Sequence, residues 1–255
     1  MKPVLEANKI RKVYGTRSNF YTAINDISLQ VERGEFVSVM GPSGAGKTTL
    51  LNVLSSIDKP SSGEVKISGT NLFKMKSREL AVFRRDRLGF IFQDYNLLET
   101  MSLKDNIILP LSLSRTSSQE TEARFQHIAK QFGIYDIRDK YPNEVSGGQK
   151  QRTSACRALI TNPDLIFADE PTGALDSKAA THLLANLERV RTEEGATILM
   201  VTHDAFAASY SDRILFIKDG EIYQELAKES STRKSFFQKI LVVLAELGGE
   251  TDARD

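Results

Sequence analysis

The chain has 255 residues, 40% of them hydrophobic, and a formal net charge of +1, which suit one globular domain or one domain with a subdomain. The near-neutral charge argues against a nucleic-acid-binding protein, because such proteins normally carry a basic excess. No apolar run approaches the roughly 20 residues that a membrane span needs, and the first residues lack the pattern of a signal peptide. Cys156 is the only cysteine, so an internal disulfide is excluded and a reducing cytosol is the expected setting.

The N-terminal part of the chain has the pattern of β structure. Three short alternating runs, separated by glycines, lie at 4–14, 27–34 and 64–69. Between them, the continuous apolar run FVSVM at 36–40 is typical of a strand buried in a parallel sheet, and a glycine loop and a helix through Leu54 follow it. We therefore expect an antiparallel β subdomain at the N-terminus and a buried strand that leads into a loop.

The rest of the chain predicts an α/β fold. From about 96 to 160 the pattern is mostly helical, which indicates a helical subdomain inserted in the sheet domain. Strands and helices then alternate, as in a parallel sheet, with strands expected at 165–169, 196–203 and 213–220 and helices at 177–194 and 205–210. We place this domain, with its mostly parallel sheet core, at 1–228. A helical tail at 229–255 is expected to pack on the domain or to contact a partner.

The segment GPSGAGKTT is a phosphate-binding loop by its pattern and by its place between a buried strand and a helix. Its glycines let backbone N–H groups turn inward and form an anion site at a helix N-terminus. The lysine adds a charge on the β- and γ-phosphates, and the threonine that follows it offers a hydroxyl to magnesium. We assign the nucleotide contacts to Gly41, Ser43, Gly44, Ala45, Gly46, Lys47, Thr48 and Thr49, with Thr48 also a magnesium ligand.

The segment LIFADE at 165–170 predicts a buried strand that ends in two acids. Ligands bind at the carboxyl ends of the strands in parallel sheets. We expect Asp169 to hold the magnesium shell and Glu170 to orient or deprotonate the water that attacks the γ-phosphate. Many strands end in solvated charges, so this interpretation depends on the phosphate loop upstream.

Two further side chains are candidates for the same site. His203 closes the strand ATILMVTH, where it would donate a hydrogen bond to the γ-phosphate or align Glu170, and its alternative is an ordinary strand-end histidine. Tyr14 ends the first strand and is a candidate for stacking on adenine through its ring face. The alternative for Tyr14 is packing on the sheet.

The order of these motifs resembles that of the nucleotide-binding subunit of ABC transporters, from Val4 to about Leu226. The resemblance rests on the phosphate loop, Gln93 in FIFQDYN, VSGGQ at 145–149, LIFADE, ALD at 174–176 and His203. Other phosphate-loop ATPases lack the SGGQ segment. The resemblance implies the ABC ATPase fold, ATP and Mg²⁺ as ligands, and hydrolysis of ATP to ADP and phosphate.

The resemblance also implies a head-to-tail homodimer that encloses two ATP molecules. In such a dimer Ser146, Gly147, Gly148 and Gln149 present a hydroxyl and a positive helix end to the ATP held by the other copy. Gln93 would sense magnesium and the attacking water, and would link the sheet core to the helical subdomain. Asp176 would couple the two sites.

Within the family, the chain looks most like ATPases of bacitracin- and lantibiotic-resistance transporters, in a wider group that includes macrolide export and lipoprotein release. This implies a membrane permease, a place on the cytoplasmic face of the membrane and, through the permease, a sensor kinase. Lipoprotein release, cell division and small-drug efflux remain alternative tasks. A soluble non-transport ABC protein is a remote alternative, since the chain lacks the long coiled coil or the second ATPase domain of such proteins. An apolar cluster after the hinge glutamine could receive the permease or belong to the core: Tyr95, Leu97, Leu98 and Met101.

Overall fold

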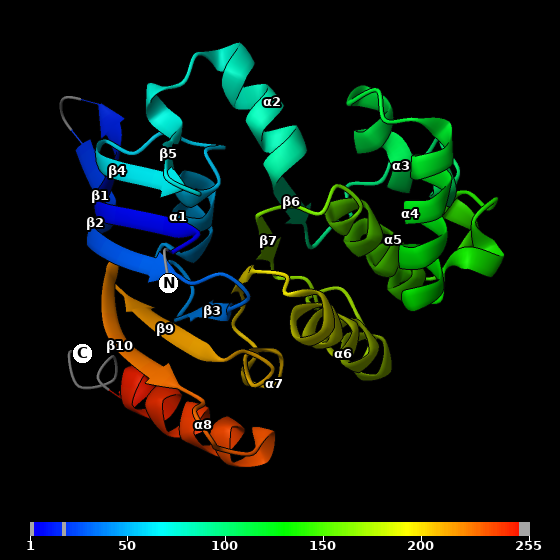
Figure 1. Cartoon of the computed structure of the whole chain (residues 1–255). Coiled ribbons are helices and arrows are strands. Elements are labelled where there is room, and N and C mark those ends of the chain that lie inside the picture. The colour runs from blue at the N-terminus through cyan, green and yellow to red at the C-terminus, as the bar shows by residue number, and fades with distance from the viewer. Residues whose placement is uncertain (1–2, 17–18, 250–255) are drawn as a thin grey trace. The chain divides into compact units, whose positions relative to one another are not determined.

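The computed structural model describes residues 3–16 and 19–249 (Figure 1). These residues form two compact units: unit 1 comprises those up to Met75 and those from Thr197 onward, and unit 2 comprises Lys76–Ala196. Within the described residues, no helix is both long enough and apolar enough to cross a membrane.

Unit 1 contains most of the strands. In chain order its elements are β1 (Leu5–Thr16), β2 (Asn19–Val31), β3 (Phe36–Met40), α1 (Lys47–Leu54), β4 (Ser62–Ile67), β5 (Thr70–Asn71), the 3₁₀ helix η1 (Leu72–Lys74), β8 (Ile198–Val201), α7 (Ala205–Ala208), β9 (Arg213–Lys218), β10 (Glu221–Ala227) and α8 (Arg233–Gly249).

The strands of unit 1 pair in two ways. β1, β2, β4 and β5 form an antiparallel sheet in the order β2-β1-β4-β5. β3 lies between β8 and β9 and is parallel to both, while β10 pairs antiparallel with β9. All five residues of β3 are buried, as its continuous apolar run predicts.

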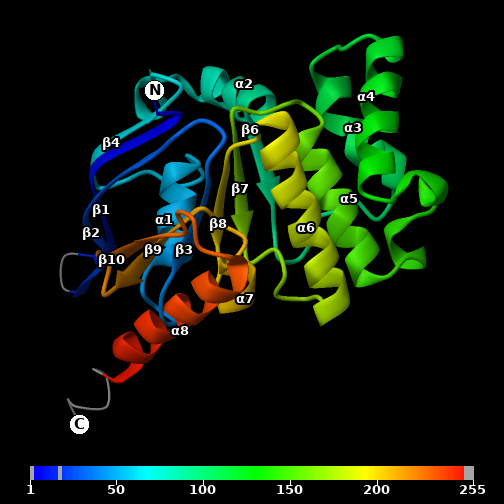
Figure 2. The same cartoon turned by 60° about the horizontal axis from the view of Figure 1, so that its bottom comes forward.

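The C-terminal helix α8 packs on the sheet of unit 1, beside the orange strands β9 and β10 in Figure 1. Its buried residues Phe236 and Ile240 share one apolar cluster with Met40 of β3 and Phe216 of β9. Figure 2 shows the same helix from below, with α7 next to it. The helix therefore covers the end of the sheet that also carries the loop after β3.

Unit 2 contains most of the helices. Its elements are α2 (Ser77–Arg87), β6 (Leu88–Ile91), α3 (Leu103–Leu113), α4 (Ser118–Gln131), the 3₁₀ helices η2 (Tyr135–Ile137) and η3 (Pro142–Glu144), α5 (Gly147–Leu159), β7 (Leu165–Asp169) and α6 (Ser177–Glu194).

In unit 2 the central helix is α5, which contacts α3, α4 and α6 as well as β6. β6 and β7 pair in parallel, so their carboxyl ends lie at the same edge. Cys156 is fully buried on α5, and burial raises the pKa of its thiol, so it serves packing rather than chemistry.

The predicted α/β class, with an antiparallel N-terminal sheet and a mostly parallel sheet, is confirmed. Four strands differ from the expectation, since β2 is longer than its predicted run and β5, β6 and β10 were not predicted. β2 begins at Asn19, eight residues before the run at 27–34, and β10 did not stand out in the sequence at all. In the added part of β2, Phe20 and Tyr21 are exposed next to each other and Ala23 and Ile24 are buried next to each other, and no residue of β10 is buried, so neither segment shows the apolar alternation that predicts a strand.

Candidate nucleotide site

The loop at 41–49 leaves β3 at its carboxyl end and enters α1, as the motif requires. Gly46 is the N-cap of α1 and Gly44 lies in the loop, and both have left-handed backbones, with φ of 94° and 81°. The first N–H groups of the helix therefore face the loop, where they can bind an anion.

The backbone of this loop is held against its neighbours without room for a side chain. A Cβ on Gly46 would lie 2.3 Å from the carbonyl oxygen of Ala23 in β2. A Cβ on Gly41 would lie 2.1 Å from the carbonyl oxygen of Ile217 in β9. The two strands therefore fix the position of the loop from both sides.

Lys47 folds back over the loop. Its Nζ donates hydrogen bonds to the carbonyl oxygens of Gly41, at 2.9 Å, and Pro42, at 2.8 Å. The ammonium group is thus held across the loop, where the sequence places the phosphates, and its charge adds to the helix N-terminus.

The hairpin of β1 and β2 brings two tyrosines to the loop. Tyr14 and Tyr21 are directly opposite each other in the pair, so they lie on the same face. The Tyr21 hydroxyl donates to the carbonyl oxygen of Gly44 at 3.2 Å, a contact that the sequence did not predict.

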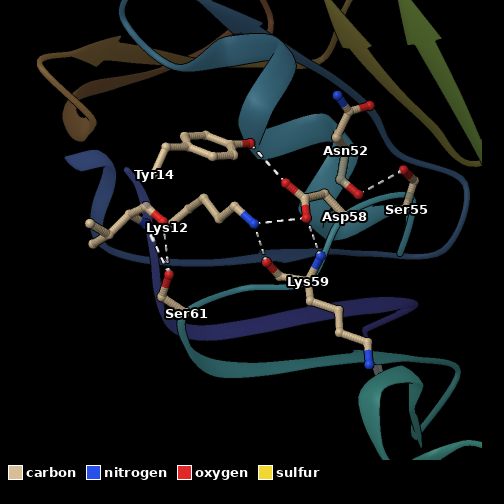
Figure 3. Close-up of polar contacts among 8 residues, drawn as sticks. Lys12, Tyr14, Asn52, Ser55, Asp58, Lys59 and Ser61 are labelled. Carbon is tan, nitrogen blue, oxygen red and sulfur yellow. Dashed lines mark hydrogen bonds and ion pairs between the residues drawn. The ribbon is translucent and has the colours of Figure 1, made fainter. Parts of the chain in front are cut away.

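Tyr14, the predicted adenine platform, is 41% exposed, so part of its ring is open to a ligand. Its hydroxyl donates to Asp58 Oδ2 at 2.8 Å, and Lys12 lies over its ring with Nζ 4.7 Å from the centroid (Figure 3). Burial raises the pKa of the Tyr14 hydroxyl, and the bond to Asp58 raises it further. Partial burial acts to raise the pKa of Asp58, but hydrogen bonds led by that from Lys12 outweigh burial and lower it.

His203 lies in unit 1, two residues after β8, and is exposed. Because β8 and β3 are parallel neighbours, their carboxyl ends meet at one edge. His203 therefore leaves the sheet at the same edge as the phosphate loop. Its neighbour Asp204 caps the short helix α7 by accepting a hydrogen bond from the Phe206 amide at 2.8 Å.

The other candidate residues belong to unit 2. Asp169 ends β7 and Glu170 follows it with a left-handed backbone, φ 45°, while the Gly173 amide donates to the Glu170 carbonyl at 3.0 Å. Gln93 follows β6, the parallel neighbour of β7, and its side chain packs against Gly173. Unit 2 therefore brings Gln93 beside the turn that carries the two acids.

Gln151, which the sequence interpretation missed, ties these two turns to the SGGQ helix. It is fully buried on α5, and its Nε2 donates to the carbonyl oxygens of Phe92, at 3.0 Å, and Pro171, at 2.6 Å. One buried amide thus holds the residue before Gln93 and the residue after Glu170.

The SGGQ segment begins α5. Ser146 is the N-cap: its hydroxyl accepts from the Gln149 amide at 3.4 Å, and its own amide donates to Gln149 Oε1 at 2.9 Å. Gln149 therefore serves the cap in this structure, while Gly147 and Gly148 form the first turn of the helix.

Next to this helix end is a cavity of about 360 Å³ that Asp176 also lines. Asp176 caps α6 by accepting from the Ala179 amide at 2.8 Å. The structure therefore joins two motifs that are separate in the sequence. It also adds three basic side chains that the sequence interpretation left out of the site: Arg152, Lys178 and His182.

Comparison with known proteins identifies the family. A family model described as ABC transporter matches residues 24–173, more than half of the chain. The chain belongs to the ABC transporter family. It is 55% identical over 246 residues to the bacitracin export ATP-binding protein BceA of Halalkalibacterium halodurans, which covers 96% of this chain and 97% of that protein. The chain is an ATPase of the ABC type, as its motif order predicts.

Two further relatives bear on the assembly. The macrolide export ATP-binding/permease protein MacB of Neisseria meningitidis is 40% identical over 225 residues, which are 88% of this chain and 35% of that protein. A dimeric structure of the ATP-binding cassette MJ0796 in a post-hydrolysis state, bound to ADP and Pi, matches with a TM-score of 0.80 at 37% identity. It covers 88% of this chain and 98% of that one, so the fold is that of an ATP-binding ABC cassette.

The residues predicted to receive a permease lie on the loop after Gln93. Tyr95 and Asn96 have left-handed backbones, and Arg157 of α5 donates to both of their carbonyl oxygens, at 2.9 and 2.6 Å. Burial lowers the pKa of Arg157. The loop is therefore anchored to the SGGQ helix.

A groove of about 340 Å³ lies in unit 2 near this loop, but Asn96 is the loop residue that lines it, and none of the four predicted residues does. Its charged lining residues are all arginines: Arg84, Arg85 and Arg157. Its apolar lining residues include Phe90, Phe92, Leu109, Pro110 and Leu113.

Alanine at Gly46 should destabilise the protein more than alanine at Gly44. Both changes put a side chain at positive φ, which costs about 1–2 kcal/mol. Only at Gly46 does the new Cβ also meet backbone, whereas at Gly44 nothing lies within 4 Å. We expect Gly46→Ala to lower the free energy of unfolding by roughly twice as much as Gly44→Ala, measured by urea unfolding without nucleotide. Equal losses would show that β2 does not constrain the loop.

Proposed function

We propose that this ABC ATPase dimerises head-to-tail on ATP and drives a membrane permease that protects the cell from peptide antibiotics such as bacitracin or lantibiotics. The proposed dimer is supported by two helix N-termini whose surroundings suit an anion. One, that of α1 in unit 1, follows the phosphate loop, and the other, that of α5 in unit 2, lies beside the cavity. The antibiotic assignment is supported by the similarity to a bacitracin export ATP-binding protein.

In the proposed reaction, the loop at 41–49 binds the phosphates and Lys47 balances the charge of the β- and γ-phosphates. Thr48 and Asp169 offer a hydroxyl and a carboxylate oxygen, which are donors that fit Mg²⁺ when phosphates complete its shell. Bound there, the ion would offset charge on the leaving phosphate. Glu170 orients or deprotonates the attacking water.

Gln93 and His203 have supporting roles in this proposal. Gln93 would contact magnesium and the attacking water from the turn after β6, and its packing against Gly173 supports a link to the turn of Glu170. His203 donates to the γ-phosphate from the edge that it shares with the phosphate loop. Tyr14 stacks on the adenine ring.

In the dimer, the γ-phosphate of one copy's ATP would enter the other copy's cavity, where Ser146, Gly147 and Gly148 receive it and Asp176 couples the two sites. Arg152, Lys178 and His182 line this cavity beside one acid, Asp176, so the basic side chains outnumber the acid and favour an anionic ligand. Because the triphosphate alone reaches both copies, hydrolysis removes the shared contact and the dimer opens.

The permease would hold the subunit at the cytoplasmic face of the membrane. We propose that it docks an amphipathic helix with acidic residues in the groove of unit 2, which offers apolar surface and arginines. The loop at Tyr95, Leu97, Leu98 and Met101 would contact the same helix from beside the groove. A sensor kinase would act through the permease.

A second candidate for the task is small-drug efflux, because a macrolide export protein is also similar to the chain. Lipoprotein release and cell division use the same type of engine. The permease decides among these tasks, so they leave the ATPase chemistry unchanged.

Glu170→Gln should abolish turnover while ATP binding remains, because the amide keeps the shape of the side chain but cannot take the proton of the water. Phosphate release should fall by about 10²- to 10⁴-fold. Light scattering should then show a dimer that persists in ATP and Mg²⁺. Glu193→Gln, an exposed change on α6, is the matched control. Wild-type phosphate release from Glu170→Gln would refute the assignment.

The antibiotic role is tested by growth of the native host with Glu170→Gln at the chromosomal locus. Sensitivity to graded bacitracin and lantibiotics should rise, because an ATPase that cannot turn over cannot drive the permease. Sensitivity unchanged for every peptide would exclude the peptide-resistance task and leave the ATPase assignment in place.

Docking is tested with two matched leucine changes, Leu113→Asp in the groove and Leu98→Asp on the loop. These side chains are 61% and 43% exposed. If the permease helix docks in the groove, Leu113→Asp should reduce the amount of subunit recovered with host membranes by roughly tenfold, the loss expected for a side chain that becomes buried in an interface. Leu98→Asp should reduce this amount less. ATP affinity of each purified variant is the control for folding. The reverse order would favour the loop over the groove.

A further inference from the structure

Asp58 is the centre of a polar network that touches the candidate adenine platform (Figure 3). Its Oδ2 accepts from the Tyr14 hydroxyl at 2.8 Å. Its Oδ1 accepts from Lys12 Nζ and from the Lys59 amide, each at 2.7 Å. Both carboxylate oxygens are therefore used, and Lys12 is held in turn by the Lys59 carbonyl at 2.7 Å.

Asp58 is also tied to helix α1. It lies four residues after Leu54, the last residue of the helix, and its amide donates to the carbonyl oxygen of Asn52 at 3.0 Å. The N-terminus of the same helix carries the phosphate loop. One short helix thus connects the group that would bind phosphates with the group that holds the Tyr14 ring.

Lys12 limits how the ring can be used. Its side chain is 12% exposed and its ammonium lies over the Tyr14 ring. Only the face away from Lys12 is left for a base, and the hydrogen bond to Asp58 holds the hydroxyl end of the ring in place. A ring fixed in this way loses less entropy when a ligand stacks on it.

We propose that Asp58 is a positioning residue for nucleotide binding, which holds the Tyr14 ring in register with the phosphate loop. The carboxylate acts through Tyr14 and does not itself touch the nucleotide. This inference rests on the proposed ATP site at residues 41–49, and it concerns the base half of that site alone.

The test compares ATP with inorganic tripolyphosphate, a probe that lacks the base. Titration calorimetry with Mg²⁺ on the full chain should show that Asp58→Ala weakens ATP binding by about tenfold, the loss expected for one charge-assisted hydrogen bond. Tripolyphosphate affinity should stay the same. In steady state, KM for ATP should rise while kcat is retained.

A double-mutant cycle separates positioning from a general effect on the fold. Tyr14→Phe keeps the ring but removes the hydroxyl, so Tyr14→Phe with Asp58→Ala should bind ATP no more weakly than Asp58→Ala alone. Additive losses would overturn the proposal. Lys59→Ala is the matched control, since it removes an exposed side chain and keeps the backbone groups of the network.

Two other outcomes decide which proposal fails. An equal loss of ATP and tripolyphosphate affinity in Asp58→Ala would make Asp58 a structural support of α1 and overturn its positioning role. Asp58→Asn, which keeps the volume, repeats the comparison if the alanine variant does not fold. If Tyr14→Ala left ATP affinity unchanged, the stacking role in the proposed function would fail instead.

Discussion

The phosphate loop depends on contacts between backbone and backbone that leave no space for a Cβ. The carbonyl of Ala23 in β2 and that of Ile217 in β9 lie against Gly46 and Gly41, so two strands from different parts of the chain hold one loop. Each contact needs the strands in their observed register, because successive carbonyls of a strand point in opposite directions and a shift by one residue would turn the carbonyl away. These contacts fix the backbone of the loop without any ligand, so binding of an anion there would not have to order it.

The same hairpin that holds the loop also carries the tyrosines. Tyr21 reaches the loop at Gly44, and Tyr14 reaches the far end of α1 through Asp58. Loop, helix and hairpin therefore form one connected group in unit 1. In unit 2, Gln151 makes a similar connection, since it joins the turns of Gln93 and Glu170 to the SGGQ helix. Each unit thus positions its own candidate site residues through hydrogen bonds within that unit.

The sequence predicted what short-range pattern encodes: the loop glycines, the apolar strands and the order of the motifs. It could not predict residues whose role comes from contacts across the chain. Asp58 acts on a tyrosine 44 positions away, and Gln151 on carbonyls 59 and 20 positions away. The first half of β2, which carries Tyr21, was missed because its apolar residues do not alternate along the strand: Ala23 and Ile24 are both buried, whereas Phe20 and Tyr21 are both exposed.

Glu170 shows how much backbone strain the proposed catalytic turn tolerates. A non-glycine residue at φ 45° costs about 1–2 kcal/mol, and glycine would remove that cost together with the carboxylate. The turn is held by the bond from the Gly173 amide to the Glu170 carbonyl, and Gln151 fixes Pro171 between them. A relaxed backbone would change the direction in which the side chain leaves the chain. The strained conformation therefore persists because the hydrogen bond from Gln151 to Pro171 and the hydrogen bond within the turn stabilise it by more free energy than the strain costs. This is usual where backbone strain serves a reaction.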